Sequence, residues 1–117
     1  MDYSFEIKKY KSGKELPIMR FEAGRELLTE FLFVNCTSVS MGNSILEELE
    51  GLMTDNIEKI NASFNGFNLE ADKHQSILTN EMDAKLLLDT KDLIQVTKKY
   101  IIEVLKYKRS NLEGTYE

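Results

Sequence analysis

Few residues in this chain have side chains suited to covalent catalysis. There is one cysteine, Cys36, and one histidine, His74. A cysteine nucleophile needs a base within hydrogen-bonding reach and a third group that orients the base. The residues around Cys36 and His74 match no known catalytic signature, and a lone cysteine among apolar residues is usually a small core residue. The sequence therefore predicts no catalytic cysteine, and a histidine that faces solvent beside a turn.

Metal and cofactor sites also lack the residues that they require. Zinc sites use clusters of cysteine and histidine at short spacing, which one residue of each type cannot supply. The chain has no run of alternating carboxylates around a glycine, which a calcium loop needs. It contains neither of the glycine-rich patterns that bind nucleotide phosphates. We therefore expect no metal and no cofactor.

Carboxylates are numerous, and hydrolases use pairs of them in different environments. A catalytic acid usually needs a desolvated pocket that shifts its pKa. The acidic residues between positions 47 and 83 stand among polar or charged neighbours, and the chain has no tryptophan to stack on a sugar. The sequence therefore favours a binding protein over an enzyme.

The charge is distributed unevenly along the chain, whose formal total is −5. Residues 23–92 contain thirteen Asp or Glu and five Lys or Arg, a balance of −8. Residues 1–22 sum to +1 and residues 93–117 to +2. A block this negative repels nucleic acid and anionic membranes and attracts basic partners. The expected partner is therefore a basic protein, and neither nucleic acid nor a membrane.

Length and composition indicate a single globular domain over residues 1–117. With 42% hydrophobic and 30% charged residues, the chain falls in the globular range. No apolar run approaches the roughly 18 residues of a membrane span, and no positive stretch followed by an apolar run indicates a secretory signal. A single cysteine fits a reducing compartment. We therefore expect a cytoplasmic protein.

The first third of the chain predicts a hairpin followed by a helix. Apolar and polar residues alternate from Tyr3, which predicts a half-buried strand, and a hairpin over 3–21 places Pro17 at a strand start or on an edge. From Ala23 the apolar residues recur at helical spacing and predict a helix over 23–33. Residues 31–34 could equally be a buried strand, which leaves the conformation of 23–34 open. The polar stretch 35–40 is predicted to be a connection.

The remaining chain predicts a helix, a meander and a terminal helix. Ser44 and Glu47 have the spacing of a capping box, which predicts a helix from about Asn43 to Thr54 or as far as Glu58. Turn signals at 65–66 and 72–73 predict an antiparallel meander over 62–79, although Gly66 could instead mark a bulge in one longer strand.

Thr90 is the expected cap of the terminal helix, and residues 110–117 are expected to fray. The predicted fold class is α+β: a small antiparallel sheet, formed by the N-terminal hairpin plus the central meander, packed against about three helices.

The acidic residues of the middle helix are the main candidate binding site. Like charges three or four residues apart on a helix cost a few tenths of a kcal/mol per pair, and no Lys or Arg lies between Arg25 and Lys59. A cationic partner would offset this repulsion, whereas the alternative interpretation is an ordinary solvated face. The candidate partner-binding residues are Glu47, Glu48, Glu50, Asp55 and Glu58, with Glu70 and Asp72 of the meander.

Three segments carry a resemblance to a known family: residues 16–21, residues 40–43 before the acidic helix, and residues 64–70 of the meander. With the capped terminal helix, their order resembles the small immunity proteins of bacterial polymorphic and contact-dependent toxin systems. Members of that family bind and neutralise a cognate toxin, often a nuclease. The resemblance implies an inhibitor of a basic nuclease toxin domain. The alternative is a non-catalytic adaptor or regulatory module that binds another protein.

Overall fold

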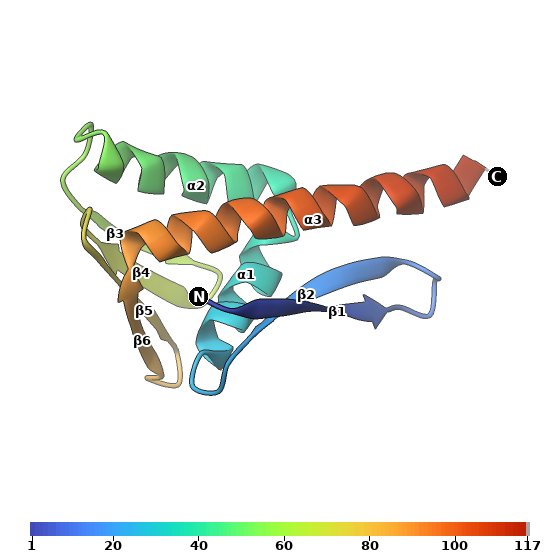
Figure 1. Cartoon of the computed structure of the whole chain (residues 1–117), viewed down its shortest axis with the longest axis horizontal. Helices are drawn as coiled ribbons and strands as arrows, with labels where there is room; N and C mark the ends of the chain where they lie inside the picture. The colour runs from blue at the N-terminus through green and yellow to red at the C-terminus, as the bar shows by residue number, and fades with distance from the viewer. Residues whose placement is uncertain (117) are drawn as a thin grey trace.

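The hairpin and the meander form two separate antiparallel sheets, which pack with three helices (Figure 1). The computed structural model describes the backbone of residues 1–116 and the side chains of residues 1–108. This arrangement confirms the predicted α+β class. The elements are β1 Tyr3–Lys9, β2 Glu15–Phe21, α1 Glu26–Cys36, α2 Val39–Met53, β3 Ile60–Phe64, β4 Phe67–Ala71, β5 Gln75–Asn80, β6 Lys85–Asp89 and α3 Thr90–Tyr116.

The N-terminal hairpin has the predicted extent. β1 and β2 pair from Tyr3 opposite Phe21 to Lys9 opposite Glu15. Pro17 lies inside β2, opposite Ile7. A proline is compatible with this position because β2 belongs to a two-stranded sheet and is paired along one side only.

The meander forms a four-stranded sheet in the order β3-β4-β5-β6. Asn65 and Gly66 have φ values of 49° and 87°, and two consecutive positive φ values are what a tight two-residue hairpin turn requires. This turn excludes the alternative of a bulge in one long strand. β6 has no counterpart among the predicted strands, because its consecutive leucines, 86–88, give no alternating pattern.

The first helix is α1, and the alternative of a strand at 31–34 is wrong. α1 begins at Glu26, after a turn, and continues to Cys36. Asn35 and Cys36 are fully buried in its last turn, so they do not belong to the expected polar connection. The Asn35 side chain donates to the Phe31 carbonyl 3.1 Å away and accepts from the Asn65 side chain at 2.9 Å. These two bonds satisfy a buried amide that the sequence alone placed in a loop.

α2 begins earlier than predicted, and its cap is a different residue. The Ser38 hydroxyl accepts a hydrogen bond from the Met41 backbone N–H, which is the usual role of an N-cap. Ser44 lies inside α2 and donates to the Ser40 carbonyl at 3.1 Å, so the predicted capping box is wrong. The helix ends at Met53 and does not reach Glu58, because Asp55 adopts a left-handed conformation with φ 59°.

α3 starts at Thr90, but the Thr90 hydroxyl bonds to the β4–β5 turn and to Ser76 and, among the described residues, makes no capping bond to an N–H of α3. The Thr90 hydroxyl donates to the Asp72 carbonyl at 2.6 Å. Because that hydroxyl has one proton, the Ser76 hydroxyl must donate to it across their 2.8 Å contact. Fraying was expected for residues 110–117. The side chains of these residues, and the whole of Glu117, lie outside the described part of the chain.

Two helices hold the hairpin and the four-stranded sheet together. The buried Tyr100 hydroxyl of α3 donates to the Pro17 carbonyl of β2 at 2.8 Å, and Thr29 of α1 donates to the Met19 carbonyl at 2.7 Å. On its other side, α1 packs Phe31 edge-on against Phe67, with ring centroids 5.6 Å apart. α1 therefore contacts both sheets.

α2 lies beside α3, as Figure 1 shows, and a glycine permits their close approach. A Cβ atom at Gly42 would lie 3.0 Å from Cδ1 and Cγ1 of Ile101. Among the helices of the described residues, none is long and apolar enough to cross a membrane.

We expect the Tyr100→Phe substitution to destabilise the fold, because it leaves the buried Pro17 carbonyl without its hydrogen-bond donor. The free energy of unfolding should fall by about 1–3 kcal/mol, measured by urea denaturation. The matched control is Tyr107→Phe on the same helix, whose hydroxyl makes no hydrogen bond within the described residues. Equal losses in the two variants would contradict the importance of the Tyr100 bond.

Candidate functional site

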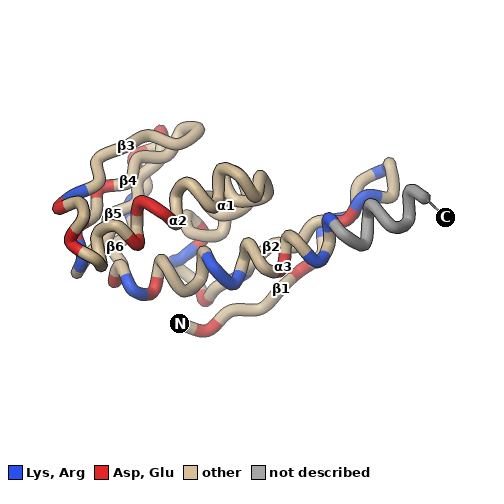
Figure 2. The backbone as a smooth tube through the Cα atoms, turned by 90° about the horizontal axis from the view of Figure 1, so that it is seen from above, with Lys and Arg blue, Asp and Glu red and all other residues tan. Residues whose placement is uncertain are grey.

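The five acidic residues predicted on and after the middle helix are all exposed. Glu47, Glu48 and Glu50 lie on α2, and Asp55 and Glu58 lie in the connection to β3. Figure 2 shows the acidic stretch of α2 on the part of the helix near the four-stranded sheet. The structure therefore keeps these carboxylates in one part of the molecule.

Two adjoining hollows run along this side of α2. One measures about 430 Å³ and is bordered by Glu47 and Glu50; the other measures about 460 Å³ and is bordered by Glu47 and Glu48. Gly51 lines both hollows, and it leaves them open because it has no side chain. We call this region the α2 surface, defined by Glu47, Glu48, Glu50, Gly51, Asn56 and Ile57 of the two hollows, together with the exposed Glu58 that follows Ile57 in the chain.

The α2 surface also contains an apolar contact point. Ile57 is 38% exposed and lines the second hollow beside two carboxylates. Ile57 and Gly51 did not belong to the predicted site. A single isoleucine in a polar loop has no periodic pattern, so the sequence contained no signal that would identify it.

Lysines distant in the sequence partly neutralise the acidic residues. Lys73 lies 3.1 Å from Asp55, and Lys98 lies 3.9 Å from Glu50. The sequence suggested that no Lys or Arg offsets the repulsion among these carboxylates. For Asp55 and Glu50 that expectation is wrong. Within the described side chains, Glu47, Glu48 and Glu58 form no ion pair. Exposed ion pairs contribute only about 0–1 kcal/mol, so a partner's cations can replace Lys73 and Lys98 at little cost.

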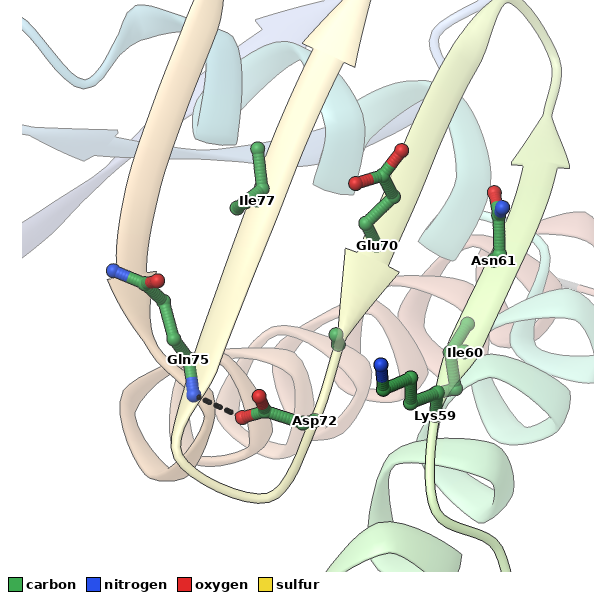
Figure 3. Close-up of a pocket in the computed structure, with 8 residues that line it drawn as sticks. Lys59, Ile60, Asn61, Glu70, Asp72, Gln75 and Ile77 are labelled. Atoms are coloured by element: carbon green, nitrogen blue, oxygen red, sulfur yellow. Dashed lines mark hydrogen bonds between the residues drawn. The ribbon is translucent and has the colours of Figure 1, made fainter.

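Glu70 and Asp72 lie in a different hollow, of about 330 Å³, on the four-stranded sheet beside the β4–β5 turn. This hollow has no lining residue in common with the two on α2. Figure 3 shows Asn61, Glu70 and Ile77 projecting from the sheet on the side away from the helices. The structure therefore divides the seven predicted binding residues between two surfaces.

Asp72 has a structural role in its turn. Its Oδ1 accepts hydrogen bonds from the backbone N–H groups of His74 and Gln75, each at 2.8 Å. The bond from Gln75, and then that from His74, lowers the pKa of the Asp72 carboxyl. These bonds occupy one carboxylate oxygen and hold the β4–β5 turn closed (Figure 3).

The structure separates Cys36 from His74. Cys36 is fully buried at the end of α1, where desolvation raises its pKa to about 12. His74 is exposed in the β4–β5 turn. A thiol with so high a pKa is protonated near neutral pH and is a poor nucleophile.

The interior formed by the described side chains is fully hydrogen-bonded. Every buried side-chain nitrogen or oxygen in that set has a hydrogen-bond partner. Within it, no group of three or more His, Cys, Asp or Glu side chains is arranged to hold a metal ion. The remaining candidate for function in the described residues is therefore the exposed surface.

Comparison of the chain with protein-family models, with curated proteins and with solved structures found no significant match.

We expect Cys36 to be unreactive in the folded protein. Burial and the raised pKa both keep the thiolate population low at pH 8. Ellman's reagent should therefore release almost no chromophore from the native protein, and one equivalent after denaturation in guanidinium chloride. Rapid reaction of the native protein would show that Cys36 is accessible.

We expect Asp72→Ala to lower the melting temperature by a few degrees at pH 7, because it removes the acceptor of two turn hydrogen bonds. Since the pKa of Asp72 is lowered by folding, its carboxylate stabilises the native state above the unfolded pKa. That stabilisation is lost as the pH falls below about 4 and through the folded pKa.

The difference between Asp72→Ala and the unmodified protein should therefore shrink in acid, as followed by thermal denaturation across a pH series. Asp72→Asn is the matched control, because its side-chain oxygen still accepts both bonds at every pH. A difference that stayed constant between pH 7 and pH 2 would contradict the role of the ionised carboxylate.

Proposed function

We propose that this protein is a cytoplasmic, non-catalytic inhibitor of the immunity type, which binds a cationic toxin domain through the α2 surface. The observation that carries the proposal is the group of Glu47, Glu48 and Glu58, which lack ion-pair partners among the described side chains. Glu47 and Glu48 border the hollow that the exposed Ile57 also lines. Charge and an apolar contact are thus available on one surface.

The physics of association supports this use of the surface. Complementary charges mainly accelerate encounter and select the partner, whereas desolvated apolar contacts slow dissociation. Ile57 supplies such a contact, and the carboxylates around it supply the charge. A nuclease domain has a basic cleft that binds phosphates. Carboxylates on the exposed face of a helix can occupy or border a cleft of that kind.

An enzymatic role has less support. Glu47, Glu48, Glu50, Asp55 and Glu58 are all exposed to solvent. A catalytic carboxyl group usually needs a desolvated environment, and the α2 surface supplies none.

The test is capture of the partner from the native cell with charge-reversed variants. The binding variant carries Glu47→Lys, Glu48→Lys and Glu58→Lys. The control carries Asp2→Lys, Glu30→Lys and Glu81→Lys. These are exposed acidic residues before β1, on α1 and in the β5–β6 turn, and they also lack ion-pair partners among the described side chains. Each triple substitution changes the formal net charge from −5 to +1. The two variants therefore differ in the place of the change and not in its size.

We expect the unmodified protein and the control variant to retain one basic polypeptide, identified by mass spectrometry, and the binding variant to lose it. Association measured by stopped flow should be at least tenfold slower for the binding variant than for the unmodified protein. Added salt should slow association of the unmodified protein, because it screens the attraction between the carboxylates and the cationic partner. The captured polypeptide should cleave nucleic acid, and the unmodified protein should inhibit that cleavage.

Equal capture by the two triple variants would contradict the assignment of the α2 surface. A captured basic protein without toxic or nuclease activity would instead identify the chain as an adaptor or regulatory module.

A further inference from the structure

β6 lies at an edge of the four-stranded sheet, where its outer side is unpaired. Within residues 1–116 it pairs with β5 alone. Figure 1 shows β6 as the last strand of that sheet, near the viewer. Protein edge strands are usually protected by proline, a bulge or a central charge. β6 reads Lys-Leu-Leu-Leu-Asp and pairs with β5 without a bulge. It has no proline, and its two charged residues lie at its ends and leave the centre apolar.

The backbone groups that face the free edge can be assigned from the two ends of the β5–β6 ladder. Asn80 donates to the Ala84 carbonyl, and Thr90 donates to the His74 carbonyl. Residues 84 and 90 therefore bond toward β5, and in an antiparallel ladder this orientation alternates along the strand. It follows that Lys85, Leu87 and Asp89 direct their N–H and C=O groups away from β5, toward the open edge.

The same three residues have exposed side chains on the outer face of the sheet. Leu87 is 49% exposed, and Lys85 and Asp89 flank it with opposite charges. Neither charge forms an ion pair within the described side chains. β6 thus combines unpaired backbone groups, an exposed leucine at its centre and an unpaired charge of each sign at its ends.

We propose that β6 pairs antiparallel with β6 of a second copy of this chain, about a two-fold axis through Leu87. In that register Leu87 faces Leu87 of the other copy, and Lys85 of each copy faces Asp89 of the other. All three edge-facing residues exchange backbone hydrogen bonds, so the two sheets become continuous. This register joins every edge-facing residue and pairs each lysine with an aspartate.

The other edge of the sheet lacks this complementarity. β3 places Asn61 and Ser63 on the outer face, and neither residue has a charge that would select one register. The β6 contact is short, because the strand has five residues. Interfaces of such limited area form weak complexes. The dimer should therefore have a dissociation constant of about 10 μM to 1 mM.

Charge exchange tests the register by sedimentation velocity over a concentration series up to about 1 mM. We expect the mass of the unmodified protein to rise from 13.5 kDa toward twice that value. Lys85→Glu places two acidic pairs across the axis and Asp89→Lys places two basic pairs. Each should weaken self-association at least tenfold, since like charges directly opposite one another are destabilising. Lys11→Glu, in the β1–β2 turn, is the control for net charge.

Mixing the two variants provides the rescue. Lys85→Glu of one copy faces Asp89→Lys of the other, and Asp89 of the first faces Lys85 of the second. The mixture should therefore associate as strongly as the unmodified protein, although each component alone remains monomeric. Circular dichroism and melting temperature verify that both variants are folded.

A cysteine at the axis gives an independent measurement. Facing hydrogen-bonded residues have Cα atoms about 5.5 Å apart, which is within disulfide range. Leu87→Cys should form a covalent dimer under mild oxidation, and Ile77→Cys, on the adjacent strand and the same face, should not. The buried Cys36 does not interfere.

A protein that remains monomeric at 1 mM, or Lys85→Glu with unchanged self-association, would overturn the proposal. Equal crosslinking rates for the two cysteine variants would overturn it as well. Failure of the β6 proposal can be distinguished from failure of the proposed partner binding by the α2 surface, because the β6 substitutions leave α2 unchanged.

Discussion

The position of the two sheets relative to each other depends on the helices between them. Within the described residues, no strand of the hairpin pairs with a strand of the meander. α1 contacts both, through Thr29 on the hairpin side and Phe31 on the meander side. α3 adds the buried bond from Tyr100 to Pro17, across 83 positions of sequence. A hydrogen bond made in a dry core is strong and directional, so this contact determines where the hairpin lies along α3.

The inner faces of both sheets pack against the helices, whereas one side of α2 and the outer face of the four-stranded sheet are exposed to solvent. α2 packs on α3 at Gly42, and its exposed residues present the carboxylates beside Ile57 of the connection to β3. The outer face of the four-stranded sheet presents polar side chains with Ile77 and Leu87 among them. The α2 surface and the β6 edge lie on different elements. A cationic partner and a second copy would therefore contact separate parts of the molecule.

The described residues whose side chains could take part in a reaction contribute to packing and local structure. Cys36 fills space between α1 and α2, where its Cβ would lie 3.3 Å from a Cβ at Gly42. Asp72 closes a turn, and the Thr90 and Ser76 hydroxyls connect that turn to α3. Buried polar groups that are fully hydrogen-bonded specify one packing arrangement. In the described part of this chain, such groups help to specify the fold.

The local patterns of the sequence determined the α+β class, the N-terminal hairpin, the Asn65-Gly66 turn and the presence of each helix. Periodicity reports which face of an element is buried, so these features depend on near neighbours. Periodicity did not identify β6, whose leucines do not alternate. The spacing of polar residues predicted Ser44 as the cap of α2, whereas the structure has Ser38 in that role. Only the tertiary structure decided that Lys73 and Lys98 reach Asp55 and Glu50 while Glu47 and Glu48 stay without ion-pair partners among the described side chains. Ion pairs and unpaired strand edges depend on which distant segments of the chain pack together, and no local sequence pattern specifies that packing.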